Sequence, residues 1–122
     1  DCGAPAARLG AAEEPPGALH VAYATERRFF PDLLLSVASL ARLHDPQDYV
    51  VHLILYEPDL PAAAGLLECL NRSGAAPRLE LHAFRADPPL LRLSRLPRAR
   101  YHPVVGRPIT WARLRLDRYL PA

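Results

Sequence analysis

The sequence contains no methionine and no lysine, and it has only two cysteines and one tryptophan among its 122 residues. Two cysteines, Cys2 and Cys69, are too few for a disulfide framework, and a bridge between them is not expected. Cys69 is expected to be a free thiol on the apolar side of a helix. The chain begins at Asp1 without a methionine or a signal-peptide pattern, so we interpret it as a processed chain or a fragment.

Long apolar runs and concentrated basic charge are also missing. No apolar stretch reaches the roughly 18 to 20 residues that a membrane span requires, so no span is expected within these residues. The formal net charge is only +2, and the arginines are spread along the chain. Because nucleic-acid-binding domains concentrate basic charge on one surface, a nucleic acid is not an expected partner. A binder that uses the arginines of residues 92–107 is the least favoured alternative.

Several catalytic and nucleotide-binding motifs are absent. The sequence has no G-x-G-x-x-G, no P-loop lysine, no C-x-x-C and no H-E-x-x-H. Ordinary dinucleotide binding, P-loop chemistry and zinc-protease chemistry are therefore not expected. The pair Glu57 and Asp59 flanks Pro58, and this arrangement is more typical of a turn and a helix cap than of paired catalytic carboxylates.

The composition divides the chain into two parts. Residues 1–17 are mostly small residues, proline and glutamate, which cannot bury enough apolar surface to offset chain entropy. We therefore expect a flexible linker or stem before one domain over residues 18–122. Asn71-Arg72-Ser73 is an N-x-S acceptor for N-glycosylation. Together with the stem, Asn71 favours the secretory pathway or the Golgi lumen, with a membrane anchor possible upstream.

The domain alternates strand and helix patterns. Apolar runs at 19–25, 49–56 and 78–84 are predicted to be strands, and the nearly continuous second run suits a parallel sheet covered on both faces. Helices are predicted from Pro31 to about His44 and from Asp59 to about Gly74. Alternation of this kind predicts an α/β, Rossmann-like parallel sheet with flanking helices. The two expected helix faces are Leu33, Leu34, Val37, Leu40 and Ala41 in the first, and Leu60, Ala64, Leu67 and Leu70 in the second.

The last third of the chain is less regular. Residues 87–107 are rich in proline and arginine and are predicted to form a long connection with a short helix over residues 90–96. A closing helix is predicted over residues 109–120, capped by Thr110 and stopped by Pro121. Its expected apolar side is Trp111, Leu114 and Leu120, with Arg113 beside it.

In open parallel sheets, ligands bind beyond the carboxyl ends of the strands. At the end of the first predicted strand, the small Ala24 and Thr25 would let a planar base approach the backbone. Glu26 could accept hydrogen bonds from a base or ribose, and Phe29 could stack on a base. Glu26 and the two following arginines also fit an ordinary solvated turn. Arg113 suits phosphate and sugar recognition, and it equally suits an ion pair with a carboxylate at the core edge.

Three histidines, His20, His52 and His82, fall inside the three predicted strands. Their spacing does not place them at strand ends, and a strand histidine is more often a hydrogen-bonded structural residue. A metal site is therefore not expected. His44 and His102 lie in loops without ligand-like spacing.

Three segments together resemble the N-terminal part of glycosyltransferase family 8, the retaining transferases with a GT-A fold. They are residues 20–26 (H-V-A-Y-A-T-E), residues 36–40 (S-V-A-S-L) and residues 108–114 (P-I-T-W-A-R-L). By this resemblance Ala24, Thr25 and Glu26 line the nucleotide site, Phe29 matches a tyrosine that stacks on uracil, and Arg113 contacts the sugar-nucleotide. The chain departs from the family at Glu26, where aspartate is usual, and at Arg28, where a small polar residue is common.

The resemblance implies a fragment of an enzyme that transfers a hexosyl or pentosyl unit from a UDP-sugar to a glycan or glycoprotein acceptor with retention. In the family, the arginine helix leads to a D-x-D motif that binds Mn²⁺ and the donor diphosphate. The 122 residues contain no D-x-D, so the Mn²⁺ ligands are expected outside this chain, and the chain alone is expected to be inactive. The alternative is a non-catalytic, Rossmann-like binding or interaction module.

Overall fold

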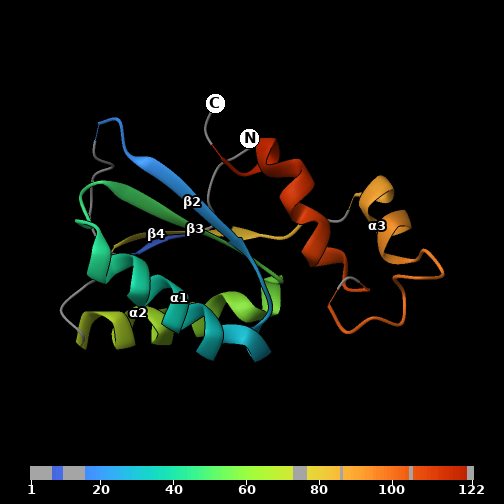
Figure 1. Cartoon of the computed structure of the whole chain (residues 1–122), viewed down its shortest axis with the longest axis horizontal. Coiled ribbons are helices and arrows are strands. Elements are labelled where there is room, and N and C mark those ends of the chain that lie inside the picture. Colours follow the sequence, from blue (N-terminus) through green and yellow to red (C-terminus); the bar gives the residue numbers. More distant parts are fainter. Residues whose placement is uncertain (1–6, 10–15, 73–76, 86, 105, 121–122) are drawn as a thin grey trace.

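A computed structural model of the chain describes residues 7–9, 16–72, 77–85, 87–104 and 106–120. Its strands form one sheet in the order β1-β4-β3-β2, and β2, β3 and β4 run parallel (Figure 1). This three-stranded parallel sheet flanked by helices is compatible with the Rossmann-like α/β class that the sequence predicts. The strands are β1 (Ala7–Leu9), β2 (Leu19–Ala24), β3 (Tyr49–Leu55) and β4 (Arg78–Ala83).

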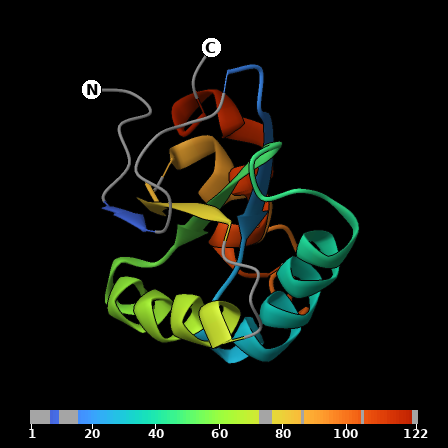
Figure 2. The ribbon, with the colours of Figure 1, turned by 90° about the vertical axis from the view of Figure 1, so that its left-hand side faces the viewer.

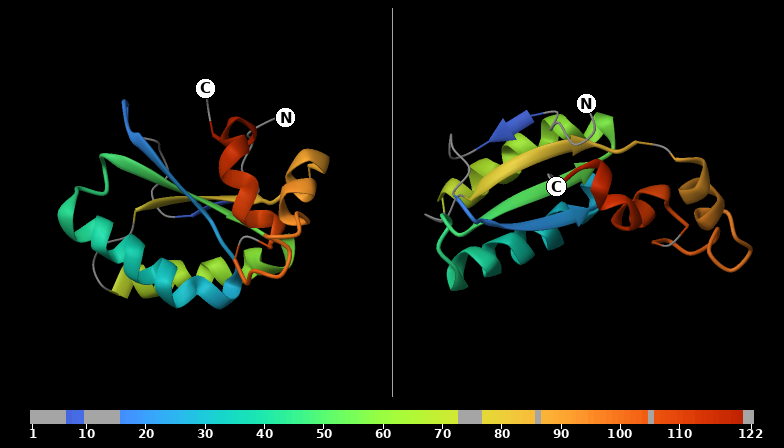
Figure 3. Two further views of the ribbon diagram at one scale, coloured as in Figure 1. Left: turned by 45° about the vertical axis from the view of Figure 1, so that its right-hand side comes forward. Right: turned by 90° about the horizontal axis from the view of Figure 1, so that it is seen from above.

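Helices cover the two faces of the sheet unequally. Helices α1 (Phe30–Leu43) and α2 (Ala63–Arg72) lie on one face, and the 3₁₀ helix η3 (Pro108–Arg118) lies on the other (Figures 1 and 2). Short 3₁₀ helices precede α1 and α2, η1 (Arg27–Phe29) and η2 (Glu57–Ala62). Helix α3 (Pro88–Ser94) lies beyond the carboxyl ends of the parallel strands (Figure 3). No helix in the described part of the chain is both long and apolar enough to cross a membrane.

The larger core lies between the sheet and the helices α1 and α2. Alternate residues of β3 point into it, and Leu33 and Val37 of α1 are buried against them, as the periodicity of this helix predicts. The buried members from β3, β4 and α2 are Val51, Leu53, Leu55, Leu79, Leu81, Ala63, Leu66 and Leu70. Because both faces of β3 are covered, all seven of its residues are buried.

The predicted face of the second helix is wrong in part. Leu70 is buried as expected, but Ala64 is exposed, and Ala63 and Leu66 take the buried positions. The difference arises in η2, the six-residue 3₁₀ helix that precedes α2. Each 3₁₀ residue turns by roughly 120°, whereas an α-helical residue turns by about 100°. The buried side of α2 is therefore rotated relative to the side that a continuous α-helix from Asp59 would bury. The same rotation leaves the free thiol of Cys69 exposed, not on the apolar side. The predictions for Cys2 and Gly74, and the side chains of Leu67 and Asn71, lie outside the described residues.

On the opposite face, η3 packs against β2 and β3. Ile109, Ala112 and Tyr119 are buried against Ala24 and Ile54. This segment is a 3₁₀ helix that begins at Pro108 and is interrupted at Arg115 (φ −131°, ψ 39°), whereas the sequence predicts a regular helix capped by Thr110. Residues i and i+3 eclipse each other in a 3₁₀ helix, so Ile109 and Ala112 face the sheet together. The expected apolar side is therefore wrong in part, because Leu114 is 62% exposed, whereas Trp111 and Leu120 are half-buried.

The expected flexible stem contains a short strand. Ala7–Leu9 pairs antiparallel with Leu79–Leu81 of β4, at the edge of the sheet that is opposite β2 (Figure 3). Backbone pairing at an open sheet edge needs no apolar side chains, which explains why composition does not reveal it. The structure therefore adds a strand at these three residues, within the flexible linker or stem that the sequence predicts over residues 1–17.

Candidate functional site

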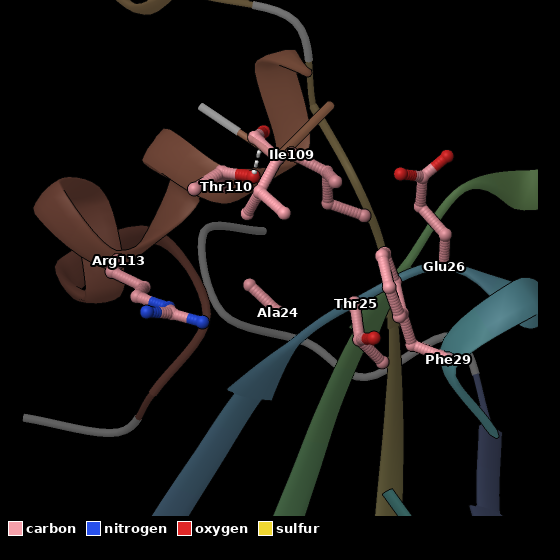
Figure 4. A pocket seen from close by; sticks show the side chains of 8 residues that line it. Ala24, Thr25, Glu26, Phe29, Ile109, Thr110 and Arg113 are labelled. Atoms are coloured by element: carbon pink, nitrogen blue, oxygen red, sulfur yellow. Dashed lines mark hydrogen bonds between the residues drawn. The ribbon is translucent and has the colours of Figure 1, made fainter. Parts of the chain in front are cut away.

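The five residues that the sequence selects as candidate ligand contacts line one pocket at the carboxyl end of β2. Ala24 and Thr25 come from the end of the strand, Glu26 and Phe29 from the turn that follows it, and Arg113 from η3 (Figure 4). The hollow has a volume of about 190 Å³. Its remaining walls are Val104, Ile109 and Thr110.

A second hollow of about 500 Å³ adjoins the first and shares four of its residues, Ala24, Thr25, Phe29 and Arg113. It extends over the first turns of α1, where Asp32 and Ser36 line it. Ligand sites for small molecules typically occupy roughly 300 to 1,000 Å³. The first hollow alone is smaller than this range, so a ligand of nucleotide size would need to use both.

Local sequence explains the shape of the pocket. Thr25 still donates its backbone N–H to Ile54, but Glu26 leads into η1, so the chain turns away from the sheet at this point. Helix η3 approaches the strand end closely because the residue at its contact is Ala112, which is fully buried. Thr110 does not cap the helix; its hydroxyl donates to the Val104 carbonyl oxygen at 2.7 Å and so joins η3 to the pocket wall.

Glu26 is already engaged by two arginines. Its Oε1 accepts two bonds from Arg107, from Nη2 at 2.7 Å and from Nε at 3.1 Å, and its Oε2 lies 3.4 Å from Nη2 of Arg28. The hydrogen bonds that Arg107 donates to Glu26 raise the pKa of Arg107. The carboxylate lies on the far side of the pocket from Arg113 (Figure 4). The expected role of Glu26 as a free acceptor for a base or ribose thus competes with these ion pairs.

Arg113 is exposed, and its guanidinium reaches from η3 toward the end of β2 (Figure 4). Among the residues that the structure describes, none forms a hydrogen bond or an ion pair with this side chain. The alternative of an ion pair with a carboxylate at the core edge is therefore not observed. Since Arg28 and Arg107 offset the one carboxylate of Glu26, the pocket carries excess positive charge and suits an anionic ligand.

Phe29 also has a neighbour that the sequence does not reveal. The guanidinium carbon of Arg28 lies 4.6 Å from the centre of the Phe29 ring, within the range of a cation–π contact. The same arginine donates to the Pro103 carbonyl oxygen at 2.6 Å, which joins η1 to the loop before η3. A planar ligand would therefore stack on the opposite face of the Phe29 ring.

A row of histidines crosses the sheet on the face that η3 partly covers. Nδ1 of His20 lies 2.7 Å from Nε2 of His52, and Nδ1 of His52 lies 2.9 Å from Nε2 of His82. Glu80 lies beside them, with Oε2 3.6 Å from Nδ1 of His52. Burial, followed by the influence of His82, lowers the pKa of His52 to about 4, and burial also lowers the pKa of His82. The hydrogen bonds expected for the strand histidines are observed, but the gathering of the three side chains is not foreseen from their spacing.

A second unforeseen group joins α3 to η3. Asp87, which is 2% exposed, accepts bonds at Oδ2 from Arg115 at 2.8 Å and from Arg118 at 2.9 Å. Its Oδ1 is buried without a hydrogen-bond partner among the described residues. The ion pairs lie at the interruption of η3, so they position the helix that carries Arg113.

The fold and the site together define an α/β domain with an arginine-bearing pocket at the end of its edge strand β2. No protein-family model matches the chain, and no curated protein or solved structure shows significant similarity to it. The chemistry of the pocket is therefore the basis for inferring what it binds. Small residues at the strand end, an aromatic ring and an arginine that pairs with none of the described residues are together typical of a site for a phosphorylated, planar ligand.

Proposed function

We propose that this chain is the nucleotide-binding part of a retaining glycosyltransferase of family 8, with a GT-A fold, and that the pocket at the end of β2 binds the UDP moiety of a UDP-sugar. The observation that supports this most strongly is the convergence of Ala24, Thr25, Glu26, Phe29 and Arg113 on one pocket. These residues were selected from two segments more than eighty residues apart. The complete enzyme would transfer a hexosyl or pentosyl unit to a glycan or glycoprotein acceptor.

Each part of the pocket has a chemical role in this proposal. Ala24 and Thr25 leave room for the base beside the strand backbone, and Phe29 offers a ring face for stacking. Among the described residues none pairs with Arg113, which lines both hollows, so it is the residue that meets the diphosphate. Arg28 and Arg107 hold Glu26 in place and thereby shape the rim of the pocket.

The residues that line the pocket do not fit Mn²⁺, the ion that the proposed family uses. Mn²⁺ prefers carboxylate and other oxygen ligands. Glu26 supplies the only carboxylate that lines the first hollow, and both of its oxygens face arginines. The second hollow adds one carboxylate, Asp32, so the lining offers no pair of free carboxylates. We therefore assign no step to a metal ion in this pocket.

A binding or interaction module without catalytic activity is the second candidate. The ion pairs of Glu26 with Arg107 and Arg28 favour it, because they occupy the carboxylate that a nucleotide would otherwise use. In this case the pocket would bind an anion through Arg113 without selecting for uracil. Binding measurements with a series of ligands separate the two candidates.

The test compares UDP, ADP, UMP and uridine by calorimetric titration of the wild-type chain and of Arg113→Ala. Arg95→Ala is the matched control, because Arg95 is exposed and does not line either hollow. Loss of a charge-assisted contact of about 1.5 to 3 kcal/mol should weaken UDP binding by about 10- to 100-fold in Arg113→Ala. Uridine, which lacks phosphate, should bind both proteins equally. Absence of UDP binding by the wild type, or equal UDP affinity in Arg113→Ala, refutes the proposal, and equal binding of other nucleoside diphosphates supports the module.

We further propose that the chain resides in the secretory pathway, as the acceptor class requires. Asn71 lies in the last turn of α2, next to the end of the helix. Expression with a secretion signal should give a product whose mass falls by one glycan after treatment with an N-glycosidase. Asn71→Gln should lack this shift, and a wild type without any shift argues against the localisation.

A further inference from the structure

His52, Glu80 and His82 form a compact buried cluster of potential metal ligands. Each offers one ligand atom, and these three atoms all lie within 4.8 Å of one another. The three residues are 0%, 6% and 2% exposed, respectively. None of them lines the pocket at the end of β2, so this cluster is separate from the proposed nucleotide site.

The register of the parallel strands creates the cluster. His52 of β3 pairs with Glu80 of β4, and His82 follows two residues later on the same face of β4. Side chains at such opposite and diagonal positions on one face are close enough to contact. The backbone thus fixes all three side chains on two central, hydrogen-bonded strands, which is a rigid support for a metal site.

The distances among the ligand atoms approach those of a coordinated ion. A tetrahedral Zn²⁺ with bonds of about 2.0 to 2.1 Å holds its ligand atoms roughly 3.3 Å apart. Nδ1 of His52 lies 2.9 Å from Nε2 of His82 and 3.6 Å from Oε2 of Glu80. One distance is shorter and the other longer than the ideal value. Shifts of a few tenths of an ångström in these side chains would therefore bring both distances from His52 to the value of a tetrahedral Zn²⁺ site.

Neighbouring groups orient the three ligands. A metal on Nδ1 of His52 would leave its proton on Nε2, which lies 2.7 Å from Nδ1 of His20 and would donate to it. Arg78 donates from Nε and Nη2 to Oε1 of Glu80, both at 3.1 Å, and so leaves Oε2 on the side of the histidines. The ring of Tyr119 packs edge-on against His82. Metal-binding histidines and carboxylates usually have such supporting partners.

We propose that His52, Glu80 and His82 form a binding site for a divalent transition-metal ion of the zinc type. Two imidazoles and one carboxylate suit Zn²⁺ better than Mg²⁺ or Mn²⁺, which prefer oxygen ligands throughout. Arg78 partly neutralises Glu80, so the charge of the ion is less well compensated than in a site with two carboxylates. A chelator such as EDTA should therefore remove the ion readily.

The test uses the 122-residue chain without a polyhistidine tag, freed of metal by EDTA and then titrated with Zn²⁺ against a chromophoric chelator. The wild type should bind one ion per chain, and Co²⁺ at the site should give the visible absorption of a tetrahedral nitrogen–oxygen complex. Glu80→Gln and His82→Gln should each weaken Zn²⁺ binding by at least about 100-fold, because residues that bind the ion directly contribute more than residues that hydrogen-bond to these ligands. His20→Gln should weaken it by about 10- to 100-fold.

His44→Gln is the matched control, because His44 is exposed and lies in the loop after α1. It should bind Zn²⁺ as the wild type does. Far-UV circular dichroism verifies that each variant is folded. If a ligand variant unfolds, X-ray absorption on the Zn²⁺-loaded wild type decides instead, with two imidazoles and an oxygen expected at about 2.0 to 2.1 Å. Absence of one-to-one binding, unchanged binding in Glu80→Gln and His82→Gln, or a spectrum without imidazole ligands overturns the proposal.

Discussion

Replacing Asp87 with asparagine should destabilise the protein strongly, although the change removes only one charge. Asp87 is 2% exposed, and its Oδ2 accepts bonds from both Arg115 and Arg118. Asparagine has nearly the same shape but presents no negative charge. The two guanidiniums would then lose their shared buried counter-ion at the interruption of η3, and only the exposed Asp117 would remain beside Arg115.

The expected loss follows from the burial of the three groups. A hydrogen bond to a charged group contributes about 1.5 to 3 kcal/mol, and breaking a buried ion pair costs about 3 to 5 kcal/mol. The arginine side chains are 35% and 33% exposed, so water screens part of this interaction. The variant also avoids the desolvation of a carboxylate whose Oδ1 has no partner among the described residues. We therefore expect a net loss of about 2 kcal/mol in the free energy of unfolding, or roughly 8 to 16 °C in Tm.

Urea unfolding followed by the fluorescence of the single tryptophan measures this loss, and the matched control is Asp117→Asn. Asp117 lies 3.4 Å from the same Arg115, but its side chain is 69% exposed. Exposed pairs contribute little, so the control should change stability by less than about 0.5 kcal/mol. The conclusion that these buried ion pairs hold η3 in place is wrong if the free energy of unfolding of Asp87→Asn lies within about 0.5 kcal/mol of the wild-type value. It is also wrong if the two variants are equally destabilised.

Three further predictions concern the histidine row, the pocket rim and the thiol. In chelator-treated protein, the free energy of unfolding should fall by about 3 kcal/mol from pH 7 to pH 4. The reason is that the pKa of His52 is about 4 in the folded protein and 6.5 in the unfolded chain. Only the unfolded chain takes up this proton between those pKa values, so a flat pH profile in urea unfolding contradicts the burial of neutral His52. Arg107→Ala removes both bonds to Glu26, yet its half-exposed side chain limits the loss to about 1 kcal/mol in the same assay. In a protein with Cys2→Ser, the exposed thiol of Cys69 should react with a thiol reagent as fast in the native state as in urea, and slow reaction in the native state would show that Cys69 is buried. Cys69→Ser should change stability by less than about 0.5 kcal/mol.

The strands and the place of the pocket follow from local sequence. The continuous run of residues 49–56 predicts a strand covered on both faces, and β3 is fully buried between α1, α2 and η3. Because ligands bind beyond the carboxyl ends of parallel strands, the sequence alone indicates Ala24, Thr25 and Phe29 as candidate contacts. Arg113 was selected from a sequence resemblance, and its place opposite them comes from the packing of Ile109 and Ala112.

The remaining features depend on contacts between distant residues. Arg107 follows Glu26 by 81 positions, and no local pattern indicates that the two side chains meet. His52 and His82 gather only because β3 and β4 pair in one particular register, which the spacing of the histidines does not specify. Hydrophobic periodicity also does not distinguish an α-helix from the 3₁₀ turns of η2 and η3, so the buried faces after Glu57 and after Pro108 were predicted incorrectly.

The central claim, that the end of β2 binds a uridine diphosphate, is tested most directly by titrating the isotopically labelled chain with UDP and following backbone amide signals by NMR. Chemical-shift changes should concentrate at Ala24, Thr25, Phe29 and the residues of η3 around Arg113, and their saturation should require about 10- to 100-fold more UDP in Arg113→Ala. Changes confined to the arginines of residues 92–107, or no saturable change at all, would contradict the account.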